Sequence, residues 1–204
     1  MTKAAGSPAP AKRAVWFPDT SALVTLAVHA PLHQAVVETL LAHDRVLVEA
    51  VVAELKGLAA TPDPVAIWAS TALAELDWLG VPVRVDDPTG TRLAAELQEV
   101  IAAGRPLIHD MQHYGEAAII ALACRARTLK PLLLSDDYDA RIVAAARGVE
   151  PLSTHKLLHL MVRQGKISSS RAAEYAEALH SAKRAHDYTA AELESGRLGR
   201  VGRP

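Results

Sequence analysis

The apolar run in "KPLLLS", at positions 130–135, constrains the fold more than any other stretch of the chain. Strands that are buried on both faces of a parallel sheet consist of such continuous apolar residues, whereas a strand with one solvated face alternates apolar and polar side chains. The segment "AVWF", at 14–17, has the same character and ends at Pro18. We therefore expect these two segments to be buried strands of one parallel sheet.

The rest of the chain alternates between strand and helix patterns. Short apolar runs predict further strands at 45–49, 81–87 and 149–153. Longer segments of helical character separate them, and the predicted helices span residues 21–29, 32–43, 50–60, 65–80, 89–104, 115–127, 136–148, 154–165 and 168–185. This alternation predicts an α/β fold with a doubly wound central parallel sheet flanked by helices. Ligands of such sheets bind beyond the carboxyl ends of the strands.

Length and composition predict one folded domain with terminal extensions. The chain has 204 residues, of which half are hydrophobic and only 4% aromatic, so we expect an aliphatic core. Residues 1–13 are rich in Ala, Pro, Gly and Ser and are predicted to form a disordered tail. We assign residues 14–165 to the α/β domain, and 166–204 to C-terminal helices and a Gly- and Arg-rich tail.

Charge and cysteine content limit the classes of protein to which the chain can belong. The formal net charge is −1, so global charge does not indicate a nucleic-acid-binding protein, although local basic patches remain available. The single cysteine, Cys124, excludes a disulfide framework and a cysteine-based zinc site within one chain. No apolar block is long enough for a signal peptide or a membrane span. We therefore expect a cytoplasmic protein with no membrane partner.

Carboxylates follow both of the predicted buried strands. Asp19 comes directly after "AVWFP", and "LLLS" is followed by Asp136, Asp137 and, after one residue, Asp139. If both strands are central and parallel, these carboxylates meet at one edge of the sheet. Helix capping is the alternative interpretation, because an Asp at a helix start accepts backbone N–H groups and complements the helix dipole.

Two further acids lie in apolar helical runs. Glu54 falls within "AVVAELKGLAA", and Glu116 leads "GEAAIIALA". A buried charge is costly without a partner, and clustered carboxylates need cations to offset their repulsion. Oxygen ligand sets of this kind suit Mg²⁺ or Mn²⁺, and two such ions can support phosphodiester hydrolysis. Taken singly, each acid is better explained as a helix cap or a charge at a helix start, and only their combination favours a metal site.

Four motifs, taken in order, resemble those of the PIN-domain nucleases: "VWFPDTSALVTLA", "VVAELKG", "GEAAIIALA" and "LLLSDDYDARIVAAARGV". The resemblance covers about residues 14–165 and implies a PIN-like nuclease domain with a metal-dependent ribonuclease site. The "GE" setting of the third acid and the C-terminal "KLLHLMVRQGKIS" are similar to a longer subfamily.

The resemblance also implies which acids hold the metal. The residues that match the family's four acids, and would bind Mg²⁺ or Mn²⁺, are Asp19, Glu54, Glu116 and Asp137. Asp139 matches an accessory acid that many members carry. The register of "SDDYD" is open, so Asp136 remains an alternative to Asp137 as the fourth acid.

Other residues indicate where a substrate would bind. Ser21 matches the small hydroxyl residue that lines the family's site, and we place Thr20 and Arg141 beside it. The residues His109, Asp110 and His113 precede Glu116 and are interpreted either as part of the site's rim or as ordinary loop residues. Contacts to RNA would come from local basic side chains, namely Arg125, Arg127, Lys130, Arg141, Arg197, Arg200 and Arg203.

The expected activity is metal-dependent hydrolysis of RNA phosphodiester bonds. Many members of the family are toxins neutralised by a small antitoxin, so an antitoxin is an expected partner, together with RNA and a second copy of the chain in a homodimer. The apolar helix faces at 22–42 and 65–79 could form either interface or ordinary core.

Two other functions compete with the nuclease, besides a plain antitoxin-binding or dimerising module formed by the helix faces at 22–42 and 65–79. The first is a PIN-like module that binds RNA or protein without cutting. The second is a receiver-like phosphoacceptor, which would need a lysine at the end of a later strand. Lys156, the available lysine, lies several residues into a helix start.

Overall fold

The computed structural model describes residues 13–107, 111–126 and 128–184. Its strands are β1 (Arg13–Pro18), β2 (Asp44–Arg45), β3 (Leu129–Leu134) and β4 (Glu150–Leu152). Its helices are α1 (Thr20–Ala27), α2 (Ala30–Leu40), α3 (Glu49–Ala59), α4 (Ala66–Ala74), α5 (Pro88–Ala102), α6 (Tyr114–Arg125), α7 (Tyr138–Ala146), α8 (Thr154–Arg163) and α9 (Ser169–Ser181), with a 3₁₀ helix η1 at Leu76–Leu79. Residues 1–12 of the predicted N-terminal tail and the Gly- and Arg-rich C-terminal tail lie outside the described residues, whereas Arg13, the last residue of the predicted N-terminal tail, begins β1.

The four strands form one parallel sheet in the order β2-β1-β3-β4. β1 and β3 are the central pair and match along their full lengths, from Arg13 opposite Leu129 to Pro18 opposite Leu134. From β1 the chain runs outward to β2 and then returns to β3 on the other side of β1. The strand order therefore reverses between β1 and β3, which is the position where open parallel sheets bind ligands.

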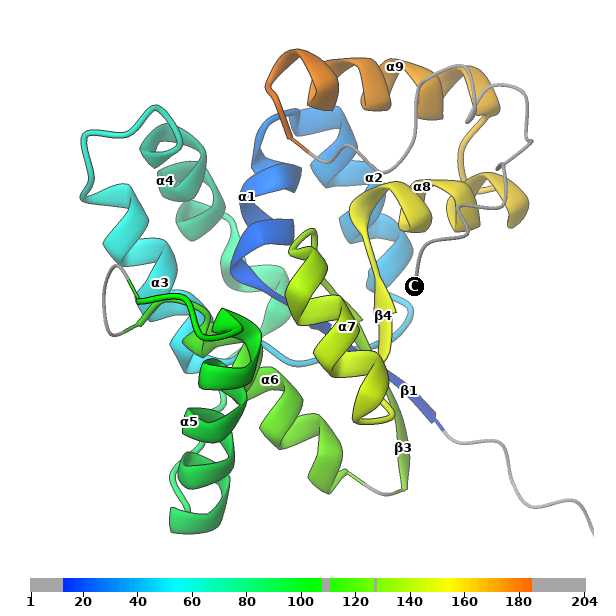
Figure 1. Ribbon diagram of the computed structural model, residues 1–204. Coiled ribbons are helices and arrows are strands. Elements are labelled where there is room, and N and C mark those ends of the chain that lie inside the picture. Colours follow the sequence, from blue (N-terminus) through cyan, green and yellow to red (C-terminus); the bar gives the residue numbers. More distant parts are fainter. Residues whose placement is uncertain (1–12, 108–110, 127, 185–204) are drawn as a thin grey trace, which may run out of the picture.

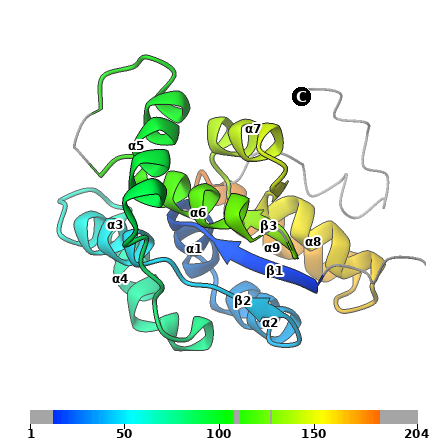
Figure 2. The ribbon, with the colours of Figure 1, turned by 90° about the horizontal axis from the view of Figure 1, so that it is seen from below.

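Helices cover both faces of this sheet, as the continuous apolar strands require. On one face Val15, Phe17 and Leu133 belong to a core with α3, α4, α5, α6 and α7. On the other face Trp16 and Leu134 belong to a second core with α2, α8 and α9. Helix α1 contributes to both cores. Figures 1 and 2 show α5 with α6 on one side of the molecule and α8 with α9 on the other. The predicted α/β doubly wound class is confirmed.

The strand predicted at 81–87 is wrong, and the strand predicted at 45–49 is shorter than expected. Only Asp44–Arg45 forms β2, and Val83 makes a single parallel bridge to Val48. Val81 is 87% exposed and Val83 43% exposed, so the Val-rich pattern of this segment does not mark a buried strand. The predicted helix at 65–80 divides into α4 and η1, which ends at Gly80 with a positive φ of 81°.

The helix faces at 22–42 and 65–79 point mostly inward. Leu32, Val36 and Leu40 are completely buried in the core shared with α8 and α9. Leu41 and Ile67 are the large apolar side chains of these segments that are exposed. Core packing therefore accounts for most of the apolar character that we considered for an antitoxin or a homodimer interface.

Candidate metal centre

Asp19 stands where β1 passes into α1. Its backbone N–H donates to the Leu134 carbonyl of β3 (3.0 Å), which holds the end of β1 against the end of β3. Its Oδ1 accepts the N–H of Ala22 (2.8 Å), so Asp19 is the N-cap of α1. The "PDTS" sequence thus ends a buried strand and starts a helix, and it leaves the Asp19 carboxylate completely buried at the reversal point of the sheet.

Ser21 connects the ends of the two central strands. Its hydroxyl donates to the Asp19 carboxylate, with distances of 3.0 Å to Oδ1 and 3.1 Å to Oδ2. The same oxygen accepts the backbone N–H of Asp136 (2.8 Å), directly beyond β3. Ser21 therefore orients the carboxylate of Asp19 and fixes the turn that carries the next two acids.

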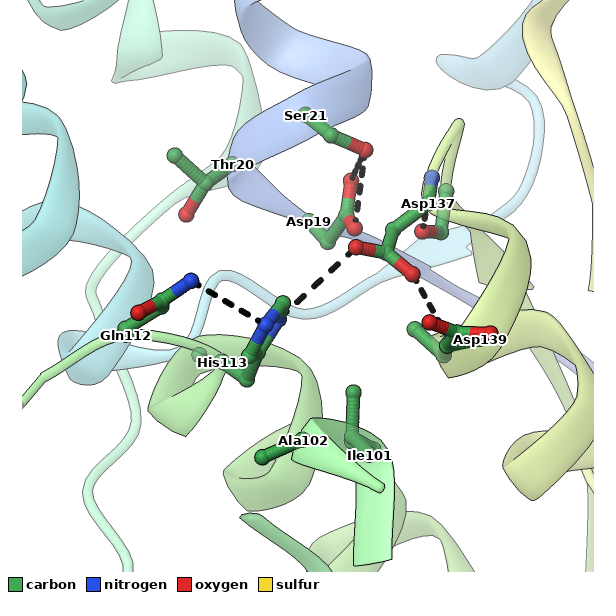
Figure 3. Close-up of polar contacts among 12 residues, drawn as sticks. Asp19, Thr20, Ser21, Ile101, Ala102, Gln112, His113, Asp137 and Asp139 are labelled. Atoms are coloured by element: carbon green, nitrogen blue, oxygen red, sulfur yellow. Dashed lines mark hydrogen bonds and ion pairs between the residues drawn. The ribbon is translucent and has the colours of Figure 1, made fainter. Parts of the chain in front are cut away.

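The two candidates for the fourth acid point in different directions. The carboxylate of Asp136 accepts both the backbone N–H and the hydroxyl of Thr154, each at 2.8 Å, at the start of α8. Asp137 caps α7 by accepting the N–H of Ala140 at Oδ1 (2.9 Å), and its Oδ2 lies 3.7 Å from His113 Nδ1. Asp137, and not Asp136, thus faces His113 and Glu116. Figure 3 shows the Asp137 carboxylate near Asp19 and directed toward His113.

Glu54 reaches the same place from α3. Its Oε2 accepts the Thr20 hydroxyl and its Oε1 accepts the backbone N–H of Gly115 (2.9 Å). A Cβ at position 115 would lie 2.9 Å from the carboxyl carbon of Glu54, which is far too close. The glycine of the "GE" motif is therefore needed so that α6 can approach this carboxylate.

Glu116 is the acid with the least support from hydrogen bonds. Its side chain is only 5% exposed, and its Oε2 has no hydrogen-bond partner among the described residues. Burial raises the pKa of Glu116 well above its usual value, and the charges of Glu54, Asp19 and Asp137 raise it further. A buried oxygen without a partner, surrounded by other carboxylates, is the arrangement that a bound cation would stabilise.

Asp19 is perturbed in the same direction. Burial raises the pKa of Asp19 from 3.8 to about 7, against the opposing effect of hydrogen bonds from Ser135, Ala22 and Ser21. The charge of Asp136 adds to the increase. Helix capping alone would stabilise the charged carboxylate, so capping does not account for this elevated pKa.

His113 joins the acids although it precedes α6 in the loop. Ligand atoms of His113, Glu116 and Asp137 all lie within 4.8 Å of one another, which is close enough to share one metal ion. The backbone of His113 is left-handed, with φ of 62°, an uncommon conformation for a residue with a side chain. Its Nε2 lies 3.4 Å from Gln112 Nε2 (Figure 3). Of the three loop residues considered with Glu116, His109 and Asp110 lie outside the described residues.

Asp139 and Arg141 stand at the margin of the cluster. Asp139 forms an ion pair with Arg105, in the segment that follows α5. Arg141 donates to the Ser135 carbonyl (3.0 Å) and lies over the ring of Tyr138. Neither belongs to the group of three that could share an ion.

An open cleft of about 820 Å³ gives access to the cluster. Its walls include residues of α1, α3, the loop before α6 and the segment after α9. The polar and charged side chains along it are Thr20, Ser21, Glu54, Thr61, Asp63, Gln112, His113, Glu116, Asp137 and Arg184. Arg184 is a residue that the sequence did not single out.

The basic residues expected to contact RNA are largely engaged elsewhere. Arg125 pairs with Asp87, and Lys130 pairs with Glu150 (2.7 Å). Arg141 donates to the Ser135 carbonyl (3.0 Å), and the remaining candidates, Arg127, Arg197, Arg200 and Arg203, lie outside the described residues.

No helix in the described part of the chain is long and apolar enough to cross a membrane. Comparison of the chain with protein-family models, with curated proteins and with solved structures finds no match.

Proposed function

We propose that this chain is a metal-dependent ribonuclease that hydrolyses RNA phosphodiester bonds at the acidic end of the sheet. The observation that carries the proposal is Glu116, a buried carboxyl group beside three other acids with one oxygen that has no hydrogen-bond partner among the described residues. Such a group does not stabilise the fold, because each ionised carboxylate increases the free-energy cost of ionising another one beside it. RNA as the substrate rests on the resemblance of the sequence motifs to PIN-domain nucleases.

The donor set fits a divalent cation. Glu116, Asp137 and His113 would hold the ion, with Asp19 and Glu54 beside it. An imidazole nitrogen among carboxylates suits a transition-metal ion better than Mg²⁺, so we propose Mn²⁺ as the preferred ion. When bound, such an ion lowers the pKa of water and stabilises negative charge on a phosphodiester.

The residues of the chain keep these donors in place. Ser21 fixes the rotamer of Asp19, and Thr20 together with the Gly115 N–H fixes that of Glu54. Asp137 is held by its bond to the start of α7. Donors locked in this way need no rearrangement when a cation binds, which is the usual requirement for a precise metal site.

The open cleft supports a polymeric substrate rather than an enclosed small molecule. It runs from the acids toward Thr61 and Asp63 beyond α3 and has apolar walls that include Val24 and Leu58. Service as a toxin, with an antitoxin as partner, remains a prediction from the family resemblance.

Two measurements test the proposal together. Cleavage of a mixed RNA pool is followed with Mn²⁺, with Mg²⁺ and with EDTA, and Mn²⁺ binding is measured by isothermal titration calorimetry. Wild type is compared with Asp19→Asn and Glu116→Gln. Glu96→Gln is the matched control, because Glu96 is an exposed glutamate of α5 that pairs, within the described part of the chain, with Arg92 alone.

We expect Mn²⁺-dependent cleavage and Mn²⁺ binding in wild type and in Glu96→Gln, with both reduced in the two cluster variants. Wild type that binds neither ion and leaves RNA intact would refute the proposal. Binding of Mn²⁺ and RNA without cleavage would instead favour the non-catalytic binding module.

A further inference from the structure

Arg184 comes to the acidic cleft from far along the chain. Helix α9 ends at Ser181, and the backbone of Lys183 is left-handed with φ of 55°. The N–H of Lys183 donates to the His180 carbonyl (2.9 Å) and the N–H of Arg184 to the Leu179 carbonyl (2.8 Å). These two bonds are those of a Schellman motif, which turns the chain sharply at the end of a helix. The position of Arg184 is therefore fixed by backbone bonds.

The side chain of Arg184 crosses to α1. Its Nη2 donates to the Ser21 carbonyl (3.3 Å) and to the Thr25 hydroxyl oxygen (3.4 Å). Both bonds are long and come from one nitrogen. The Nε of Arg184 is buried and has no hydrogen-bond partner in the described part of the chain. A guanidinium has five N–H donors, so most of its hydrogen-bonding capacity is unused here.

Several other arginines pair with a carboxylate, whereas Arg45 donates to a set of backbone carbonyls. Arg13 pairs with Asp44, Arg105 with Asp139 and Arg125 with Asp87. Arg184 pairs with no carboxylate among the described residues, although it lines the same cleft as Glu54, Glu116 and Asp137. It is also the only arginine or lysine among the described residues that line this cleft. A partly buried cation without a counter-ion is costly unless an anion binds to it.

We propose that Arg184 binds a backbone phosphate of the substrate in the cleft, close to the acidic cluster. The proposal rests on the proposed nuclease function and adds to it a phosphate subsite supplied by the C-terminal segment. The carboxylates repel a polyanion, and a bound cation offsets that repulsion only at the phosphate that it contacts. A guanidinium matches the geometry of phosphate oxygens and would hold a neighbouring phosphate with its free N–H groups.

The test compares three variants of the full chain. Arg184→Gln removes the positive charge, and Arg184→Lys keeps the charge but lacks the planar array of N–H donors of a guanidinium. Lys183→Gln is the control and removes one positive charge from the adjacent exposed residue. Binding of a single-stranded 2′-O-methyl RNA, which resists cleavage, is measured by fluorescence anisotropy with Mn²⁺ at several salt concentrations. The kcat and KM for cleavage of the unmodified RNA and the affinity for Mn²⁺ alone are measured in parallel.

We expect Arg184→Gln to weaken RNA binding by about 10-fold or more, as expected for a lost charge-assisted hydrogen bond. KM should rise with a smaller change in kcat, and the salt dependence of binding should become shallower. Arg184→Lys should recover part of the affinity. Affinity for Mn²⁺ should not change, and Lys183→Gln should resemble wild type.

Different failures identify different errors. If Arg184→Gln lowers the melting temperature but leaves RNA affinity and KM unchanged, Arg184 only anchors the end of α9 to α1 and the inference is wrong. If wild type binds the RNA without cutting it and Arg184→Gln loses that binding, the subsite stands and the nuclease function falls. If wild type neither binds nor cuts RNA, both fall.

Discussion

Replacing Asp19 with Asn should stabilise the metal-free protein at neutral and alkaline pH, contrary to the usual effect of changing a buried, hydrogen-bonded residue. Asn keeps an oxygen to accept the Ala22 N–H and therefore keeps the helix cap. What it removes is a charge that the folded state disfavours. The pKa of Asp19 rises from 3.8 to about 7 on folding, chiefly because the carboxylate is buried.

The magnitude and the pH range follow from this shift. A raised pKa of an acid means that the contribution of the group to stability is full below pH 3.8 and is lost as the pH rises through about 7. A shift of about three units at 1.36 kcal/mol each gives a penalty of about 4 kcal/mol at pH 8. At pH 5 Asp19 is protonated in most folded molecules, and the free-energy penalty of burying its charge falls to about 1.7 kcal/mol.

Urea unfolding in EDTA at pH 5, 6, 7 and 8 measures this difference between wild type and Asp19→Asn. The variant should be more stable at pH 8, and its advantage should shrink by about 2.5 kcal/mol toward pH 5. Part of the gain comes from Glu116, whose pKa the Asp19 charge raises. Added Mn²⁺ should stabilise wild type more than the variant, because the cation offsets the charge that the variant lacks.

Asp87→Asn is the matched control. Asp87 also caps a helix, α5, by accepting the Gly90 N–H (2.9 Å). Its pKa is lowered by that bond and by Arg125, so the stability that it contributes is present above pH 3.8 and lost only as the pH falls further. The control should therefore destabilise the protein by the same amount throughout pH 5–8. An Asp19→Asn variant that is less stable than wild type at pH 8, or whose advantage does not depend on pH, would refute the reasoning.

Three further substitutions probe the site and its surroundings. Gly115→Ala should displace the Glu54 carboxylate and reduce the affinity for Mn²⁺ measured by calorimetry. Gly57→Ala is its control: the space around the new Cβ is open, so the affinity for Mn²⁺ should not change and the free energy of unfolding should rise by roughly 0.5–1 kcal/mol. His113→Gln should lower Mn²⁺ affinity by about tenfold and Mg²⁺ affinity less, because imidazole favours transition metals; equal losses for both ions would count against His113 as a ligand. Lys183→Gly should increase the free energy of unfolding by about 1 kcal/mol, because glycine adopts a left-handed φ without strain. Urea unfolding, with a higher midpoint for the variant, measures this gain.

The main features of the fold were predictable because the two central strands are buried on both faces. Their continuous apolar residues identify β1 and β3, and the parallel arrangement then places Asp19 and Asp137 at one edge. The prediction of a strand at 81–87 is wrong because the Val residues of this pattern can occupy an exposed extended segment as well as a strand. Hydrogen-bond pairing decides between these, and here it is limited to Val83, which donates to the Leu47 carbonyl (2.8 Å) and accepts the Glu49 N–H (2.9 Å) in a single bridge opposite Val48.

Parts of the site were not predictable from local sequence. His113 reaches the acids through a left-handed backbone turn, and nothing in "QHYGE" indicates that conformation. The sequence pattern predicts a helix through residue 185, which includes Arg184, whereas α9 ends at Ser181. Glycine usually marks such a helix end, but here Lys183 takes the left-handed position, so the usual signal is missing.

Helix capping and metal binding turn out to be compatible at the acidic cluster. Asp19 and Asp137 each use Oδ1 to cap a helix, and Oδ2 of Asp137 faces His113. Capping therefore accounts for the position of these two residues and leaves the nature of the site undecided. Glu116 favours a cation site, because its Oε2 accepts no bond among the described residues and burial together with the neighbouring carboxylates raises its pKa. A proton or a cation can neutralise such a group. Ligand atoms of His113, Glu116 and Asp137 lie close enough to share one ion, so Glu116 is the residue from which we infer the metal centre.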